Sequence, residues 1–320
     1  MEPAAVIKRA VAILRRGGLI GLPTETVYGL AADAENEIAV RGIFAAKGRP
    51  ADHPLIVHLA DARQIDDWAF QIPASARRLA HAFWPGPLTL ILRRSSKAAE
   101  AVTGGLSTIG LRVPAHEVAQ QLLREFGGGL AAPSANRFGH VSPTLPQHVR
   151  DELGDRVELV LEGGACEIGI ESTIVDLSSD QPAVLRPGAI TAEQIESVLG
   201  EPLADPLHNT TKTAGRLASH YAPRAAVELV SENELEARAM QWAIEGRTVA
   251  ILAPHCELAL PGIFVRPMPV DPAAFARELY AALREVDACG VQLALIVPPP
   301  ESGLGLAIAD RLRKASAPRE

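Results

Sequence analysis

The sequence contains few aromatic side chains and no long apolar run. Phe, Trp and Tyr make up 4% of its 320 residues, whereas apolar residues as a whole make up 48%. A buried core must therefore be built mostly from aliphatic side chains and alanine. The apolar share is too high for a disordered chain, and the length predicts about two domains. No run approaches the roughly 18 apolar residues of a membrane-spanning helix, so we expect no membrane partner.

Cysteine is also scarce, with single residues at Cys166, Cys256 and Cys289. Three widely separated cysteines fit neither a disulfide framework nor a zinc knuckle. This usage is typical of a reducing cytosol. The amino-terminal segment carries four basic residues within 8–16, where a signal peptide would need an apolar run. We therefore expect a soluble, cytoplasmic protein.

Basic residues are outnumbered by acidic ones, 31 to 38, which gives a formal net charge of −7. Binding to a nucleic-acid backbone depends on a surplus of basic groups. We therefore expect no strong direct binding to a nucleic-acid backbone, although a local basic cleft is compatible with an acidic chain.

Helical and strand patterns alternate through the first two thirds of the chain, which predicts an α/β domain over residues 1–203. The expected helices are 4–16, 38–47, 74–84 and 116–126, and the expected strands are 19–22, 55–59, 88–92, 108–113, 157–161 and 173–177. Residues 204–224 have little apolar periodicity and read as a linker or lid.

Beyond the linker, three β-α steps predict a small, doubly wound, Rossmann-like parallel sheet over residues 225–320. The expected strands are 226–230, 248–253 and 291–297, with a short extended piece at 262–266. The expected helices are 232–245, 272–286 and 303–314.

Lys47-Gly48-Arg49-Pro50 follows an expected helix, and lysine is rare in this chain. A lysine beside an arginine suits a polyphosphate. Cations at a helix carboxyl end are also favoured by the helix dipole, and the spacing alone supports both interpretations equally.

Ser134-Ala135-Asn136 follows Pro133, and such small polar groups can donate to phosphate or ribose oxygens. A helix N-cap or an Asx-turn is the structural alternative, favoured from the local sequence alone. Arg112 lies in an expected strand between apolar neighbours and must have an anionic partner. That partner is either a buried carboxylate or the carboxylate of a ligand.

Several other classes of site are disfavoured. His53 and His58 are five residues apart with a strand starting between them, which is not the spacing of a chelating pair. We expect no metal site made by protein side chains. The Gly-x-Ser-x-Gly elbow and the Walker lysine loop are absent, which argues against a serine hydrolase and a P-loop kinase.

A set of motifs follows in a fixed order along the chain: 22–30 (LPTETVYGL), Lys47-x-Arg49-Pro50 with 53–55, 84–89 (WPGPLT), 133–136 (PSAN), 169–176 (GIESTIVD), 185–188 (LRPG) and 220–223 (HYAP). Together they resemble the YrdC-like family of threonylcarbamoyl-AMP synthases in its long, two-domain form. Each motif is weak alone, but their fixed order is specific, and the likeness covers the whole chain.

The resemblance implies a twisted α/β catalytic domain with a deep, positively charged cleft, followed by the small carboxy-terminal domain. It implies a nucleotidyltransferase that converts L-threonine, bicarbonate and ATP into threonylcarbamoyl-AMP, pyrophosphate and water. Mg²⁺ would arrive with ATP. The product would pass to a separate transferase complex that modifies tRNA.

The resemblance also implies roles for individual residues. Lys47 and Arg49 would face the ATP phosphates as the catalytic cations, and Asn136 would lie close to phosphate or magnesium. The other residues that would hold the nucleotide are His53, Thr108, Ser134, Ser142 and Arg186, with His220 or Tyr221 closing over it from the linker. The residues that would hold threonine are Thr26, His58, Arg112, the backbone of Ala132, and Ser172.

Two alternatives come from other classes. An RNA-binding accessory protein without turnover would share a concave positive surface. A carbamoyl-transfer domain of hydrogenase-maturation proteins would carry cysteine-rich and acylphosphatase-like segments, which this chain does not contain.

Overall fold

The computed structural model describes residues 3–179, 181–205, 220–256, 258 and 262–318. They belong to two compact units. The first comprises Met1–Phe138, Pro143–Glu167 and Glu171–Arg216, and the second comprises Gly139–Ser142, Ile168–Ile170 and Leu217–Glu320. Most of the expected linker, 206–219, lies outside the described residues.

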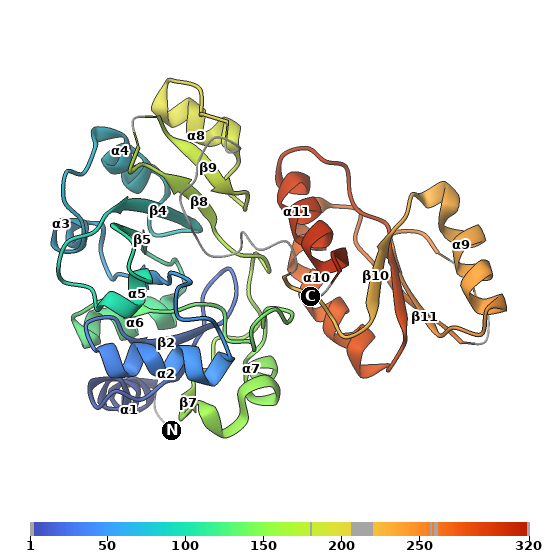
Figure 1. Ribbon diagram of the computed structural model, residues 1–320, viewed down its shortest axis with the longest axis horizontal. Coiled ribbons are helices and arrows are strands. Elements are labelled where there is room, and N and C mark those ends of the chain that lie inside the picture. The colour runs from blue at the N-terminus through green and yellow to red at the C-terminus, as the bar shows by residue number, and fades with distance from the viewer. Residues whose placement is uncertain (1–2, 180, 206–219, 257, 259–261, 319–320) are drawn as a thin grey trace. The chain divides into compact units, whose positions relative to one another are not determined.

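Nine strands of the first unit form one mixed sheet in the order β7-β1-β2-β6-β3-β5-β4-β8-β9 among the described residues (Figure 1). Their bounds are β1 Ile20–Leu22, β2 Gly29–Asp33, β3 Ile56–His58, β4 Leu88–Arg93, β5 Thr108–Arg112, β6 Leu130–Ala131, β7 Leu159–Val160, β8 Thr173–Asp176 and β9 Ala183–Arg186. The central pairs β3·β5 and β4·β8 are parallel, whereas β4·β5 is antiparallel.

Helices of this unit pack against the sheet and against one another. Their bounds are α1 Pro3–Arg15, α2 Glu37–Lys47, α3 Ile65–Trp68, α4 Ala74–Phe83, α5 Glu100–Thr103, α6 Glu117–Phe126, α7 Pro146–Leu153 and α8 Ala192–Leu199, with 3₁₀ turns η1 Ala62–Gln64 and η2 Gly154–Arg156. The helices and strands expected from periodicity are present, with ends displaced by about one or two residues.

The sequence patterns missed β2, β6, β9, α3, α5, α7 and α8. β6 has two residues, too few to show a period. α8 begins with a capping box in which the Thr191 side chain accepts from the Gln194 backbone and the Gln194 side chain accepts from the Thr191 backbone. That Thr-x-x-Gln spacing is a sequence signal for a helix start.

The two faces of the sheet are covered differently. Apolar side chains of α2, α4 and α8 pack on one face, against residues such as Val57, Leu90 and Leu111. On the other face, α1 and α6 cover the end of the sheet near β1 and β6. Over β3, β4, β8 and β9, that second face carries a small apolar cluster to which no described helix contributes. Its buried residues are Ile56, Ile91, Ile174, Ala183 and Leu185. A face left without a helix is available to polar groups and ligands.

The second unit contains a four-stranded parallel sheet in the order β10-β13-β11-β12 among the described residues. Its helices lie on both sides of the sheet, α9 on one and α10 with α11 on the other (Figure 1). The expectation of a small doubly wound parallel sheet is confirmed. The bounds are β10 Ala226–Leu229, α9 Glu232–Ile244, β11 Val249–Ala253, β12 Ile263–Pro267, α10 Pro272–Ala288, β13 Leu293–Ile296 and α11 Leu304–Ser316.

Within the described ranges, the helices are too short or too polar for any of them to cross a lipid bilayer.

Candidate functional site

Lys47 lies at the carboxyl end of α2 and is almost completely buried, at 3% exposed. Its Nζ donates to the backbone oxygens of Ser134 and Asn136, rather than to the last carbonyls of its own helix. Burial and the neighbouring Arg49 hold the pKa of this lysine well below its usual value. Lys47 therefore joins its own motif to the Pro133–Asn136 motif, about ninety residues later in the sequence. A favourable interaction with the dipole of its own helix does not explain this contact.

The turn after α2 sets the direction of the chain at this point. Gly48 ends the helix in the left-handed region, with φ of 61°, and its N–H donates to the oxygens of Phe44 and Ala45. The Arg49 backbone then donates to Phe44 over 3.0 Å. The Arg49 side chain donates to the Pro54 oxygen over 3.1 Å, and its guanidinium lies 5.9 Å from the ring of Phe138.

The Pro133–Asn136 loop is held alongside β2 by backbone hydrogen bonds. Leu30 donates to Pro133 and Ala135 donates to Tyr28, each over 2.8 Å. The Asn136 side chain donates to the oxygen of Arg137 over 2.8 Å. No helix starts at this loop in the described chain, since α7 begins ten residues later at Pro146. The N-cap alternative for Ser134 is therefore wrong.

Arg112 lies at the end of β5 on the helix-free part of the second face, and Glu25 is its buried carboxylate partner. The two residues are each 4% exposed, with 2.7 Å between Arg112 Nη2 and Glu25 Oε1. Arg112 also donates through Nη1 to Thr26 Oγ1 over 2.9 Å and through Nε to the Gly86 oxygen over 3.2 Å. The expectation of an anionic partner is confirmed, and the partner belongs to the loop between β1 and β2.

The hydroxyl of Thr24 organises this loop. It donates to the Val27 oxygen over 2.6 Å and accepts from the backbone of Thr26 over 3.2 Å. Thr24 and Thr26 are 2% and 1% exposed, so the turn is locked by buried hydrogen bonds. The loop therefore holds Glu25 and Thr26 against Arg112.

His58 lies beside Arg112, because the parallel pair β3·β5 sets these two residues opposite each other. Burial and the nearby guanidinium lower the pKa of His58 to about 3. The imidazole is therefore neutral at neutral pH, and it can exchange hydrogen bonds without adding a second positive charge. Ala132, whose backbone N–H donates to Ile56 over 3.0 Å, lies on the neighbouring segment.

Ser172 and Arg186 form a further part of this face. The Ser172 hydroxyl lies 2.8 Å from Thr89 Oγ1, and Arg186 donates to the Ser172 oxygen and hydroxyl over 3.0 and 3.1 Å. An irregularity in the pairing of β8 and β9 sets Arg186 opposite Ile174. Bulges of this kind redirect side chains next to functional sites.

Thr108 lies apart from these contacts, whereas His53 lies against the Phe138 ring that the Arg49 guanidinium also approaches. Thr108 lines a hollow of about 570 Å³ with Phe70, Arg93, Arg94 and Ser178. Neither of those two arginines has a carboxylate partner among the described residues. The His53 ring packs edge-on against Phe138 at 5.4 Å.

Three of the expected nucleotide residues belong to the second unit, namely Ser142, His220 and Tyr221. Tyr221 is 1% exposed and has a φ of 62°, which is uncommon for an aromatic residue. Its ring stacks on Tyr280 at 5.8 Å and receives the Arg311 guanidinium at 5.3 Å. The next residue, Ala222, donates to the Gly139 oxygen over 3.1 Å, which links the segments that carry Ser142 and Tyr221.

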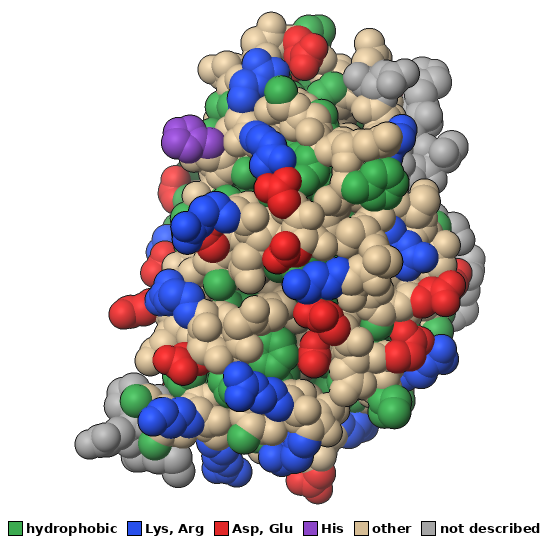
Figure 2. Space-filling view, turned by 90° about the vertical axis from the view of Figure 1, so that its left-hand side faces the viewer, with side chains coloured by type: hydrophobic (Ala, Val, Ile, Leu, Met, Phe, Trp, Pro, Cys, Tyr) green, Lys and Arg blue, Asp and Glu red, His purple; other side chains and the backbone are tan. Residues whose placement is uncertain are grey.

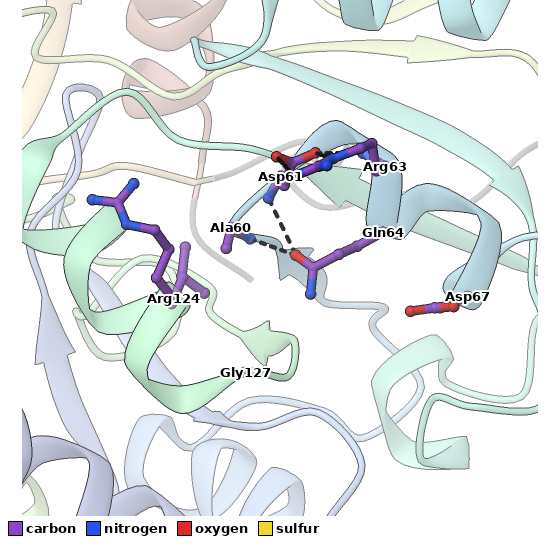
Figure 3. A pocket seen from close by; sticks show the side chains of 8 residues that line it. Ala60, Asp61, Arg63, Gln64, Asp67, Arg124 and Gly127 are labelled. Atoms are coloured by element: carbon purple, nitrogen blue, oxygen red, sulfur yellow. Dashed lines mark hydrogen bonds and ion pairs between the residues drawn. The ribbon is translucent and has the colours of Figure 1, made fainter.

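Another hollow of the first unit, of about 440 Å³ beside η1 and α6, contains none of the residues expected at the site. Its Asp61 is already paired with Arg63 (Figure 3). On one face of the molecule, basic and acidic side chains are interspersed (Figure 2). Within the described ranges, no three His, Cys, Asp or Glu side chains gather to hold a metal ion.

Sequence reasoning missed Glu25, Thr24 and Thr89 as members of the site. Thr24 and Glu25 lie within the 22–30 motif, so the polar run Thr24-Glu25-Thr26 between two apolar strands was an available signal. Thr89 alternates with the core residues Leu88 and Leu90 along β4, so it lies on the opposite face of the strand, beside Ile91.

Two family models match consecutive parts of the chain. Residues 12–188 match the Sua5, YciO and YrdC model, described as telomere recombination. Residues 190–317 match the carboxy-terminal domain of threonylcarbamoyl-AMP synthase.

Full-length relatives and a solved structure are also similar. The chain is 42% identical to the threonylcarbamoyl-AMP synthase of Pyrococcus abyssi, over 98% of this chain and 94% of that protein. It is 40% identical to that of Bacillus subtilis, over 98% and 93%. The crystal structure of Pyrococcus abyssi Sua5 complexed with L-threonine matches with a TM-score of 0.91 at 41% identity, over 99% of this chain and 95% of that one.

Proposed function

Because this chain belongs to the Sua5, YciO and YrdC family, we propose that it is an enzyme that makes threonylcarbamoyl-AMP from L-threonine, bicarbonate and ATP. The reaction class is nucleotidyl transfer, with release of pyrophosphate and water. The single observation that carries the proposal is the buried polar face around Arg112, next to the buried Lys47 and its loop, in a chain similar over its length to a threonine-bound protein.

We assign threonine binding to the residues around Arg112, on the helix-free part of the second face of the sheet. Arg112 would bind the substrate carboxylate through N–H groups that its protein partners leave available, because a guanidinium recognises carboxylates in a planar, directional way. Thr26, neutral His58, the backbone of Ala132 and the hydroxyl of Ser172 offer uncharged hydrogen-bonding groups for the rest of a small polar amino acid.

The ATP half is assigned to the cations and small polar groups near α2. Lys47 and Arg49 would face the triphosphate, and Mg²⁺ enters as part of the substrate Mg-ATP. The other proposed nucleotide residues are His53, Thr108, Ser134, Asn136 and Arg186 of the first unit, and Ser142, His220 and Tyr221 of the second.

The chemistry needs alignment and charge neutralisation rather than a nucleophilic side chain. The threonine amine forms a carbamate with carbon dioxide derived from bicarbonate, and a carbamate oxygen attacks the α-phosphorus of ATP. Attack by one bound substrate on another gains chiefly from orientation, and cations stabilise the charge that moves to pyrophosphate. Arg49 supplies such a cation. Lys47, whose pKa is lowered by burial and by Arg49, would be held in its charged form by the negative charge of the bound triphosphate.

The product is a mixed anhydride, so a separate enzyme must transfer its threonylcarbamoyl group, and we propose a tRNA-modifying transferase complex as its recipient. The interspersed charges of Figure 2 give no broad basic surface on that face, which is consistent with weak tRNA binding. We place the reaction in the cytoplasm, where free thiols such as Cys166, Cys256 and Cys289 persist.

The direct test is pyrophosphate release by the purified protein with L-threonine, bicarbonate and Mg-ATP, with mass spectrometry of the product from labelled threonine. Release should stop when threonine is omitted. Release that ignores the amino acid would reject the synthase. A salt-sensitive shift of tRNA without turnover would favour an RNA-binding accessory protein instead.

Lys47→Met tests the catalytic cation, because methionine fills the same buried space without charge. We expect turnover to fall by at least about 100-fold, as for loss of a group that neutralises transition-state charge. Lys8→Met removes a lysine from the exposed side of α1 and is the matched control. Equal activity of the two variants would remove Lys47 from the site.

A further inference from the structure

The carboxylate of Glu25 lies against the guanidinium that we assign to the substrate carboxylate, and the proposed roles leave it unused. Its Oε1 is 2.7 Å from Arg112 Nη2, and both side chains are almost fully buried. Burial of an ion pair costs desolvation energy that mutual attraction repays only in part. Stability alone is therefore a weak reason for an acidic residue at this place.

The pair has no net charge, and this changes which ligand it suits. A guanidinium that is already neutralised attracts a simple carboxylate weakly. An α-amino acid carries a carboxylate and an ammonium on the same carbon, and those two charges match a guanidinium and a carboxylate that lie side by side. The pair is thus complementary to a zwitterion.

Arg112 still has N–H donors with which to bind such a ligand. A guanidinium has five N–H donors. Contacts to Glu25, Thr26 and Gly86 each use a different nitrogen, so both terminal nitrogens keep a second N–H. A substrate carboxylate can therefore bind to Arg112 without displacing Glu25.

The neighbouring titratable groups do not offer an alternative base. His58 has a lowered pKa and is neutral at neutral pH, so it supplies no negative charge to attract an ammonium group. Burial and the charge of Glu25 raise the pKa of the Cys166 thiol, which keeps it protonated. Glu25 is the carboxylate that lies directly against the Arg112 guanidinium.

We propose that Glu25 binds the α-ammonium of threonine and accepts its proton, which makes the amine nucleophilic; this role rests on the proposed function. One N–H proton passes to Glu25 and from there to bicarbonate, which loses water and becomes carbon dioxide. The nitrogen lone pair then forms the N–C bond to carbon dioxide, and the second N–H proton leaves to solvent. The sum is R–NH₃⁺ + HCO₃⁻ → R–NH–COO⁻ + H₂O + H⁺, which balances without a further reactant.

The first test is binding in the absence of ATP, measured by calorimetry with two ligands on the full chain. L-Threonine carries the ammonium, and 2,3-dihydroxybutanoate of matching configuration carries a hydroxyl in its place. The wild-type protein should bind threonine about 10- to 100-fold more tightly, as expected for one charge-assisted hydrogen bond. Equal binding of the two ligands by the wild-type protein would overturn the proposal without any variant.

The second test is Glu25→Gln, with Glu35→Gln as a control that removes a partly exposed carboxylate. Glu25→Gln should remove the preference for threonine, raise the KM for threonine by about 10- to 100-fold and lower kcat, with the KM for ATP changed by less than about threefold. Equal weakening of both ligands would show a merely structural role, and unchanged threonine binding would exclude Glu25. Glu25→Asp should restore part of the preference.

The two proposals fail in different ways. Wild-type protein that prefers threonine but releases no pyrophosphate would reject the synthase and leave the ammonium site in place. Wild-type protein that releases pyrophosphate while Glu25→Gln behaves normally would reject the role of Glu25 alone.

Discussion

At the scale of single residues, the site is built from charges that the fold buries and pairs with neighbours. Arg112 is held by Glu25, Thr26 and Gly86, and Lys47 is held by two loop carbonyls. Fixed polar groups in a dry site do not need to reorganise when a charged substrate reacts. This arrangement makes the site sensitive to changes of protonation.

His58 should make the protein acid-sensitive. Its pKa is about 3 in the folded protein and about 6.5 when unfolded, so the unfolded state binds the additional proton between these values. Stability from this residue is complete above about pH 6.5 and is lost as the pH falls toward 3. Between pH 7 and pH 4.5 the loss should be about 2–3 kcal/mol.

The measurement is urea unfolding of the wild type and of His58→Gln at both pH values. The variant has no imidazole to protonate, so its free energy of unfolding should fall by about 2–3 kcal/mol less over this interval than that of the wild type. Identical pH dependence in the two proteins would contradict a neutral, buried His58.

At the scale of elements, α2 carries Lys47 into the site through its two caps. The Asn36 side chain accepts from Ile38 and Ala39 at the start, and Gly48 ends the helix with a left-handed backbone. Both signals are visible in the sequence as Asn before an apolar periodic run and Gly after it. The helix ends were therefore readable, whereas the partners of Lys47 were not.

Gly48→Ala should cost about 1 kcal/mol of stability, because a left-handed backbone is unfavourable for alanine. No atom lies within 4 Å of the added methyl group, so the cost is conformational. We also expect turnover to fall by about tenfold or more, since a shifted turn moves Lys47 and Arg49. Thermal unfolding and pyrophosphate release measure the two effects.

Gly127→Ala is the matched control. Gly127 ends α6 with φ of 79°, also has open space around its Cβ position, and lies beside the hollow of Figure 3 rather than the site. The same loss of stability with normal turnover is expected. If Gly48→Ala also kept normal turnover, the turn would not position the two cations.

At the scale of the whole molecule, each unit holds apolar clusters of its own among the described residues. The clusters of the first unit draw on residues from Val6 to Ala204, and that of the second draws on residues from Val230 to Val297. A domain with its own core can fold alone. The expected boundary near residue 203 stays a prediction.

A fragment of residues 1–205 should therefore unfold cooperatively and bind threonine, because Arg112, Glu25 and His58 all belong to the first unit. Its turnover should fall by about tenfold or more, because Ser142 loses its neighbours in the second unit and His220 and Tyr221 are removed. Denaturant titration, calorimetry with threonine and pyrophosphate release test these outcomes. Unchanged kinetics would show that the second unit has no part in the reaction.

The sequence by itself determined the order of most elements, the two α/β units and the family, because periodicity, caps and ordered motifs are local properties of the chain. Tertiary structure decided that Glu25 meets Arg112 and that Lys47 meets the Ser134 loop. Those contacts depend on the order of strands in the sheet and on which face each strand presents. Long-range pairing of this kind leaves no period in the sequence, so a buried carboxylate could be expected beside Arg112 but not identified.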